Sequence, residues 1–459
     1  MPGAVWGTLP SMSPERQEPG RFPVQLPVAA AATAPGCYLG AAAYLGLPSP
    51  HLGSALEALL YGVAIVGAAF VLSWAAEAAQ VDINAGLALA LLALLAVLPE
   101  YAVDFVFALE CGNAYQPGQS GAPPEVCSLA LANMTGANRV LVGVGWPLVV
   151  LVATLAVWWG RRRRGGEEGA ASDSTRFGEV QLAPVMSVEI AFLGMATLYS
   201  LTLPIRDSLS LWDTLVFVGL FAGYAWRLSR MSATEPDLLG VSLWVGSQPA
   251  RHRRTWVAAM FVTAAVMILL TAEHFASSLV STGTELGVSN FLLVQWVAPL
   301  ASESPELIVA CLYAWRLKAE DSLGTLLSSK VNQWTLLVGG LPVVFALSAF
   351  TTAGLPLQTE QRYELLITAS QSLFAVAVLL DRSITFRGAL TLLSLFLVQF
   401  FVSVLASAEA NRITIVALSA VYGVLALGRF ARQRQETVRL FKDGTVTPLE
   451  KIEDEPAHA

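Results

Sequence analysis

Charged residues are scarce in this chain. Only 13% of its 459 residues are Asp, Glu, Lys or Arg, and 55% are hydrophobic, whereas soluble domains carry about 25% charged residues. The apolar residues fall in runs of about 18 to 28, which is long enough for a helix to cross a bilayer. This composition excludes an ordinary soluble domain and predicts an all-α polytopic integral membrane protein whose solvent is the lipid bilayer.

Catalytic and cofactor motifs are also lacking. The sequence holds no nucleotide-binding loop, no nucleophile triad, no Cys/His metal cluster and no haem motif. These absences predict a protein that is not an enzyme, needs no cofactor and binds no nucleic acid. An intramembrane hydrolase is a distant alternative, since no nucleophile or metal triad accompanies the acidic residues of the apolar segments.

Cysteine is rare, with four residues in the chain. Cys111 and Cys127 enclose a Gly- and Pro-rich segment, whereas Cys37 and Cys311 have no obvious mate. A disulfide between the first two would persist in an oxidising compartment. Two free thiols at helix ends are the alternative, and the sequence leaves both open.

The order of apolar and polar segments predicts about eleven membrane spans. Residues 1–50, rich in Pro, Ala and Gly, are expected to form a flexible leader without a signal peptide or a span. The predicted parts that follow are a first transmembrane repeat, a cytoplasmic linker, a second repeat, an extra helix and a cytoplasmic tail, at 51–228, 229–253, 254–410, 411–430 and 431–459.

Basic residues indicate the orientation. Arg161 to Arg164, Arg251 to Arg254 and Arg429 to Arg439 all lie in loops on one side of this arrangement, and basic loops are cytoplasmic. The resulting prediction is an N-terminus outside and a C-terminus in the cytoplasm, in a bacterial inner membrane. The two five-helix halves then run antiparallel, as inverted repeats.

Two similar stretches carry the unusual chemistry. Leu91–Glu110 and Gln295–Arg316 are apolar, yet each contains a Pro-Glu pair, Pro99-Glu100 in one and Pro305-Glu306 in the other. A carboxylate at the centre of a membrane helix costs at least about 2.5 kcal/mol to insert. The recurrence of so unfavourable a feature in both halves predicts an ion site between them.

A second pair of motifs follows these stretches. Asn138 precedes Gly145 by seven residues at the start of one apolar run, and Asn332 precedes Gly339 by the same interval in the other half. This spacing supports the division into two repeats.

At these residues the chain resembles the calcium/cation antiporter superfamily, to which the sodium/calcium exchangers belong, as a divergent bacterial-type member. Leu286 to Ser289, Ala301 to Glu306, Leu95 to Glu100 and Ala132 to Asn138 match its motifs in altered form. The resemblance implies alternating access around paired intramembrane glutamates. It also implies that cation ligands come from the Pro-Glu helices and the helices after them.

The chain departs from the family pattern at several ligand positions. A Thr-Ser pair is replaced by Ala96-Val97 in the first half and by Ser302-Glu303 in the second. Arg139 and Lys330 lie beside further ligand positions. Either cation could fill the site itself, and the acids would then only lock the helices together.

The predicted ion site combines carboxylates with neutral oxygen ligands. Glu100 and Asp104 are four residues apart and Glu303 and Glu306 three, so each pair shares one helix face. A hard divalent ion such as Ca²⁺ takes six to eight oxygens. The predicted metal ligands are Glu100 and Glu306, and the wider ion-binding set adds Glu303, Asp104, Ser302, Asn138, Asn332 and Thr335.

These features predict a secondary antiporter that exchanges Ca²⁺ for Na⁺ or H⁺. A proton-coupled antiporter of monovalent cations fits the lost hydroxyl ligands and is the main alternative. A membrane protein that transports nothing is a third, and in it Arg139 or Lys330 would occupy the site. Inorganic cations and lipid are the only partners predicted.

Overall fold

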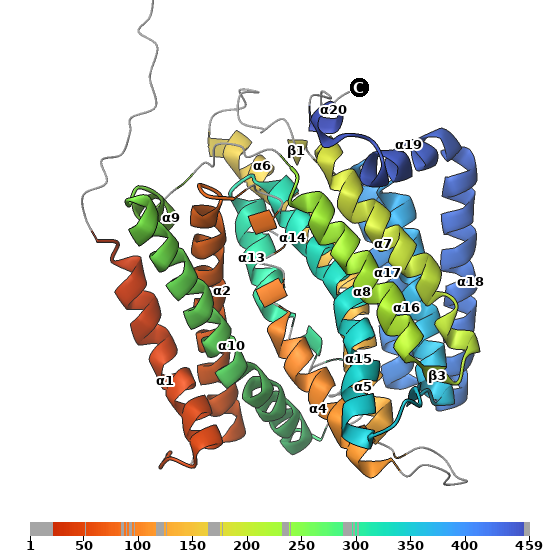
Figure 1. The fold of residues 1–459 in the computed structure, drawn as a ribbon, viewed down its shortest axis with the longest axis horizontal. Coiled ribbons are helices and arrows are strands. Elements are labelled where there is room, and N and C mark those ends of the chain that lie inside the picture. Colours follow the sequence, from red (N-terminus) through yellow and green to blue (C-terminus); the bar gives the residue numbers. More distant parts are fainter. Residues whose placement is uncertain are drawn as a thin grey trace, which may run out of the picture.

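Side-by-side helices dominate the structure, a computed structural model (Figure 1). It describes residues 22–50, 52–83, 87–88, 90, 94–95, 97–115, 124, 126–163, 175–176, 178–231, 238, 240–287, 296, 299–300 and 303–453. Eight helices in this part of the chain are long and apolar enough to cross a membrane. Each predicted span overlaps a described helix, although the first halves of the spans at 84–109 and 289–315 lie largely outside the described residues. The all-α polytopic fold is confirmed.

The first repeat contains five helical units in chain order. They are α2 (Ser54–Ala79), α4 (Leu98–Ala114), the continuous unit α5 (Val126–Val140), η1 (Leu141–Gly145) and α6 (Trp146–Arg163), α7 (Ser187–Ser200) and α8 (Leu211–Leu228). Short segments connect them: β1 (Thr175–Arg176), β2 (Glu179–Gln181), the turns η2 (Pro184–Met186) and η3 (Leu203–Ile205), and β3 (Ser208–Leu209). A short helix, α9 (Val241–Gly246), then lies in the predicted linker.

The second repeat has the same order of units. They are α10 (Ala250–Glu285), α13 (Ser304–Trp315), the unit α14 (Ala319–Asn332), η5 (Gln333–Leu337) and α15 (Val338–Ala349), α16 (Thr359–Val378) and α17 (Phe386–Leu405), with β4 (Leu355–Pro356) and β5 (Ser383–Thr385) between them. Three further helices follow: α18 (Ala408–Arg432), α19 (Arg434–Thr445) and α20 (Leu449–Glu453).

Two details show that the repeats are inverted copies. The third unit of each contains a π-helical segment, η1 in one and η5 in the other. Strand β2 pairs with β5, and β3 pairs with β4, both antiparallel. Strand β2 precedes the fourth unit of the first repeat and β5 precedes the fifth unit of the second. Strand β4 precedes the fourth unit of the second repeat and β3 precedes the fifth unit of the first. Each strand pair therefore becomes the other pair when the two repeats are exchanged. The two sheets lie at opposite ends of the bundle, where β1 and β3 are labelled (Figure 1).

The first helices of the repeats pack along each other. α2 and α10 form a layer with a further helix, α1 (Gln25–Leu45), at the left of Figure 1. At one end of this layer Arg253 donates to Asp82, with 2.8 Å between Nε and Oδ2. This hydrogen bond lowers the pKa of the Asp82 carboxyl to about 2, so the pair stays charged at neutral pH. The ion pair thus fastens the end of α2 to the start of α10.

Helix α1 corrects the prediction of a flexible leader over residues 1–50. Residues 25–45 form a helix that is one of the eight candidate spans, whereas residues 1–21 lie outside the described part. The glycines that suggested a broken segment are packing positions: a Cβ on Gly36 would lie 2.4 Å from the Leu60 carbonyl oxygen of α2, and one on Gly40 would lie 1.9 Å from that of Leu270 in α10. Small residues four apart allow such close contact between membrane helices.

The extra helix also changes the predicted orientation of the chain ends. Phe22 contacts Trp244 of α9, with 5.3 Å between ring centroids. Arg227, at the end of α8, donates to the carbonyl of Gly444 in α19 at 3.0 Å. The first described residue and the C-terminal helices therefore lie at the same end of the bundle (Figure 1). The prediction of termini on opposite sides is wrong for the described chain, because α1 adds one crossing.

Cys111 and Cys127 form a disulfide, with their Cα atoms 4.7 Å apart. The bond joins the end of α4 to the start of α5, at the end of the bundle opposite α9 and α19 (Figure 1). Of the two alternatives for these cysteines, the disulfide is confirmed. Cys37 and Cys311 are free thiols.

The close contact of α1 gives a stability prediction. Gly40→Ala places a methyl group against the Leu270 backbone, which cannot withdraw as a flexible side chain can. We expect the free energy of unfolding in detergent to fall by about 1–3 kcal/mol, which is the usual range for an overpacked core. Gly423→Ala is the matched control, since nothing lies within 4 Å of a Cβ there. Equal melting temperatures for the two variants would contradict the packing role of Gly40.

Candidate functional site

Two helices begin beside each other near the middle of the bundle, and each begins with a Pro-Glu pair. α4 starts at Leu98 and α13 at Ser304, with the proline in the first turn. Proline suits this position because its missing N–H would have no partner at a helix start. Glu100 and Glu306 lie in the same first turns, where the positive end of the helix dipole favours a carboxylate. The Pro-Glu pairs therefore mark helix starts within the bundle.

The structure brings four of the predicted acids together. Glu100, Asp104, Glu303 and Glu306 are each 0% exposed. Glu306 is close enough to Glu100 and Glu303 to interact electrostatically with both, and Glu303 with Glu100 as well. The carboxylates of the two repeats thus face one another across the repeat interface.

Amides from the following helices hold two of the acids. Asn133 of α5 donates to Asp104 at 2.9 Å, and Gln333 of η5 donates to Glu303 at 2.5 Å. Each of these two acids is therefore fixed by the third unit of its own repeat.

Glu306 makes no hydrogen bond to another side chain in the described part of the chain. Both of its carboxylate oxygens are buried and have no hydrogen-bond partner among the described residues, and the same holds for the Asn138 amide oxygen. An ionised carboxylate without compensation in such a place costs several kcal/mol. A proton or a bound cation at Glu306 would remove that cost.

The two predicted asparagines connect the repeats. The Tyr101 hydroxyl, next to Glu100 in α4, donates to the Asn332 amide oxygen at 2.8 Å. Lys330 Nζ of α14 donates to the Asn138 backbone carbonyl at 3.0 Å. Both hydrogen bonds cross from one repeat to the other and so surround the acids.

The two buried cations differ in their surroundings. Arg139 forms an ion pair with Glu364 of α16, with 2.6 Å between Nη2 and Oε2, and its guanidinium lies 4.9 Å from the Trp296 ring centroid. Lys330 is electrostatically attracted to Glu303. The hypothesis that both cations pair with the site acids therefore fails for Arg139, because Glu364 provides its partner.

Two predicted ligands are not placed at the acids. The Thr335 hydroxyl donates to the Val331 carbonyl of its own helix, and Ser302 lies outside the described residues. In the described part of the chain, no three His, Cys, Asp or Glu side chains converge to hold a metal ion.

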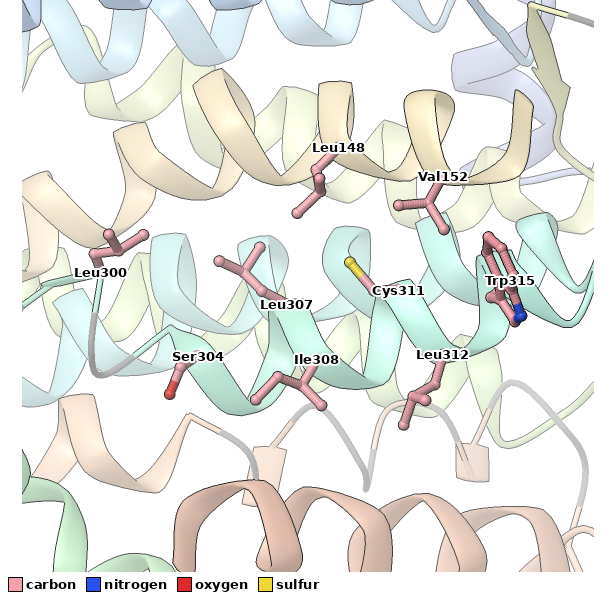
Figure 2. Close-up of a pocket in the computed structure, with 9 residues that line it drawn as sticks. All are labelled: Leu148, Val152, Leu300, Ser304, Leu307, Ile308, Cys311, Leu312 and Trp315. Atoms are coloured by element: carbon pink, nitrogen blue, oxygen red, sulfur yellow. The ribbon is translucent and has the colours of Figure 1, made fainter. Parts of the chain in front are cut away.

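Grooves lie on the other face of α13. Leu148 and Val152 of α6 face Leu307 and Cys311 across a cavity of about 500 Å³ with almost entirely apolar walls (Figure 2). A second cavity, of about 570 Å³, lies between α13 and the layer of α2 and α10, and Ser304 lines both cavities. The helix therefore separates apolar space from the carboxylates.

Sequence reasoning missed several residues that support the site. The list comprises Tyr101, Asn133, Gln333, Glu364 and Gln371. Each is a polar side chain in an apolar helical run, and that pattern was the available signal. Pairing them with their partners required the tertiary structure.

Comparison with known proteins assigns this architecture to a family. A model of the sodium/calcium exchanger protein family matches residues 54–229 and 256–430. The chain belongs to the sodium/calcium exchanger family. The two matches begin at α2 and near the start of α10, so each covers the helices of one repeat. A search of curated proteins found no match.

Solved structures of exchangers share the fold. The H⁺/Ca²⁺ exchanger CAX is 38% identical, with a TM-score of 0.76, and the match covers 93% of this chain and 97% of that one. The sodium-calcium exchanger NCX_Mj, soaked with 100 mM Na⁺ and 10 mM Sr²⁺, is 14% identical, with a TM-score of 0.53 and coverage of 77% and 99%. At that identity the second likeness concerns the exchanger fold alone.

Proposed function

We propose that this exchanger-family protein exports Ca²⁺ in exchange for H⁺ or Na⁺, with Glu100 and Glu306 as the central ligands. One observation carries the proposal: the two glutamates lie in the first turns of corresponding helices of the two repeats, are fully buried, and are close enough to interact electrostatically across the repeat interface. A divalent cation or protons would compensate two carboxylates so placed. Glu303, Asp104, Ser302, Asn138, Asn332 and Thr335 are proposed to supply further oxygens.

We propose H⁺, in preference to Na⁺, as the coupling ion. The likeness at 38% identity is to a protein described as an H⁺/Ca²⁺ exchanger, and protonation of Glu306 would compensate its unpartnered oxygens. Alternating movement of α2 and α10 against the remaining helices would expose the glutamates to one side at a time. We place the protein in a bacterial inner membrane, with the basic end that holds α9 and α19 in the cytoplasm.

A monovalent-cation antiporter remains the second candidate. It is favoured by the loss of hydroxyl ligands in the first half, where Ala96-Val97 stands in place of the family's Thr-Ser pair. Such a protein would use the same glutamates for H⁺ and Na⁺ or K⁺.

A thermal melt in detergent tests Ca²⁺ binding directly. Ca²⁺ at about one hundred times its Kd should stabilise the native protein by about 2.7 kcal/mol. Glu100→Gln should remove this stabilisation, because it deletes one of the two central carboxylates. Mg²⁺ at the same concentration and ionic strength is the control for charge screening. An equal response to both ions, or an unchanged response in Glu100→Gln, would contradict the proposed site.

A further inference from the structure

Lys330 lies in surroundings that suit a monovalent cation. The side chain is 0% exposed. Its Nζ donates to the Asn138 carbonyl at 3.0 Å, lies 5.6 Å from the Trp334 ring centroid and is attracted by the Glu303 carboxylate. Carbonyl oxygens and carboxylates are ligands of Na⁺, and a ring face also attracts cations. The ammonium group thus occupies a place that would otherwise attract a free cation.

Lys330 lies at the repeat interface. It precedes the π-helical segment η5 by three residues, and it lies two residues before Asn332, which corresponds to Asn138 by the spacing to the following glycine. Lys330 and Asn138 meet across the repeat interface. One repeat contributes a carbonyl oxygen at this point and the other contributes a positive charge.

A lysine that only held the helices together would be expected to form a direct ion pair with an acid. Lys330 and Gln333 are one helical turn apart, and it is Gln333 that hydrogen-bonds Glu303. Among the described residues, Lys330 forms no direct ion pair with Glu303. Arg139, by contrast, pairs directly with Glu364. The direct contact of the ammonium is with a backbone carbonyl, as expected for a bound cation.

We propose that the Lys330 ammonium is a built-in cation that takes the place of a transported Na⁺ and so excludes Na⁺ from the site. This inference rests on the H⁺-coupled form of the proposed function, in which Glu100 and Glu306 carry the transported ion. It makes Lys330 a specificity-determining residue. Removing the ammonium leaves the Asn138 carbonyl and the Glu303 carboxylate free to bind Na⁺.

Na⁺ binding to purified protein, measured without Ca²⁺, tests the proposal. Lys330→Ala should bind radioactive Na⁺ and show a melting temperature that rises and then saturates with NaCl, at ionic strength held constant with choline chloride. The wild type and Lys330→Arg, which keeps a charge, should show neither effect. Lys451→Ala, at an exposed lysine, is the matched control.

Two outcomes would overturn the proposal. One is a folded Lys330→Ala protein that is indifferent to Na⁺. The other is a wild type that binds Na⁺ and loses this binding in Glu303→Gln, a result that needs no Lys330 variant to fold. Lys330→Met combined with Glu303→Gln removes both charges and should remain insensitive to Na⁺. Because these readouts do not involve Ca²⁺, failure of Ca²⁺ transport would leave them interpretable.

Discussion

Replacement of Glu306 by Gln is expected to abolish Ca²⁺ uptake into proteoliposomes. The side chain is fully buried, and its oxygens have no hydrogen-bond partner in the described chain, so its charge is available only to a cation or a proton. Loss of a buried charge partner costs about 3–5 kcal/mol, which corresponds to a loss of uptake on the order of 100-fold or more. Glu100→Gln should have the same effect, because the repeats place it equivalently.

The coupling ion follows from the gradient that drives this uptake. Radioactive Ca²⁺ uptake should be measured into vesicles with an acid interior and, separately, into vesicles loaded with Na⁺. If H⁺ is the coupling ion, the acid interior alone should drive uptake. Glu110→Gln, at an exposed acid of the same helix as Glu100, is the matched control and should transport normally.

Two results would contradict this prediction. Uptake that survives in Glu306→Gln would remove the glutamate from the mechanism. An inserted wild type that takes up no Ca²⁺ under either gradient would favour the monovalent antiporter. The same vesicles loaded with a pH-sensitive dye would then report exchange of H⁺ for Na⁺ or K⁺.

Arg139→Met is expected to destabilise the protein strongly without removing an ion ligand. Arg139 is 1% exposed and its partner Glu364 is 15% exposed, so the substitution leaves a carboxylate largely buried without its cation. The expected loss is about 3 kcal/mol, at the lower end of the range for a broken buried pair because Glu364 keeps some contact with solvent. Arg139→Met combined with Glu364→Gln should recover much of this loss.

Thermal unfolding of the two single variants and the double variant gives the coupling energy. Arg412 and Glu360 form an ion pair whose side chains are 51% and 60% exposed, and Arg412→Met is the control. An exposed pair contributes about 0–1 kcal/mol. If Arg139→Met were as mild as Arg412→Met, Arg139 would have no role in joining α5 to α16.

The sequence was sufficient for the membrane class and the two repeats, and it singled out two acids that the structure buries. Apolar runs must form helices in lipid, where every backbone group needs an internal partner, so the helices could be located from composition. Glu100 and Glu306 were identifiable because a carboxylate in such a run is unfavourable without a function. The Pro-Glu pairs repeat, and the structure places both at helix starts.

Tertiary structure decided which groups meet. Glycine in α1 suggested a break by its conformational freedom, but Gly36 and Gly40 lie where neighbouring backbones approach, and only the packed helices reveal this. The partner of Arg139 is Glu364, more than two hundred residues away in the chain. Lys330 reaches the carbonyl of Asn138 across the repeat interface. Local pattern places a charge on a helix, but the pairing of charges depends on how the helices are arranged, because electrostatic attraction acts through space and not along the chain.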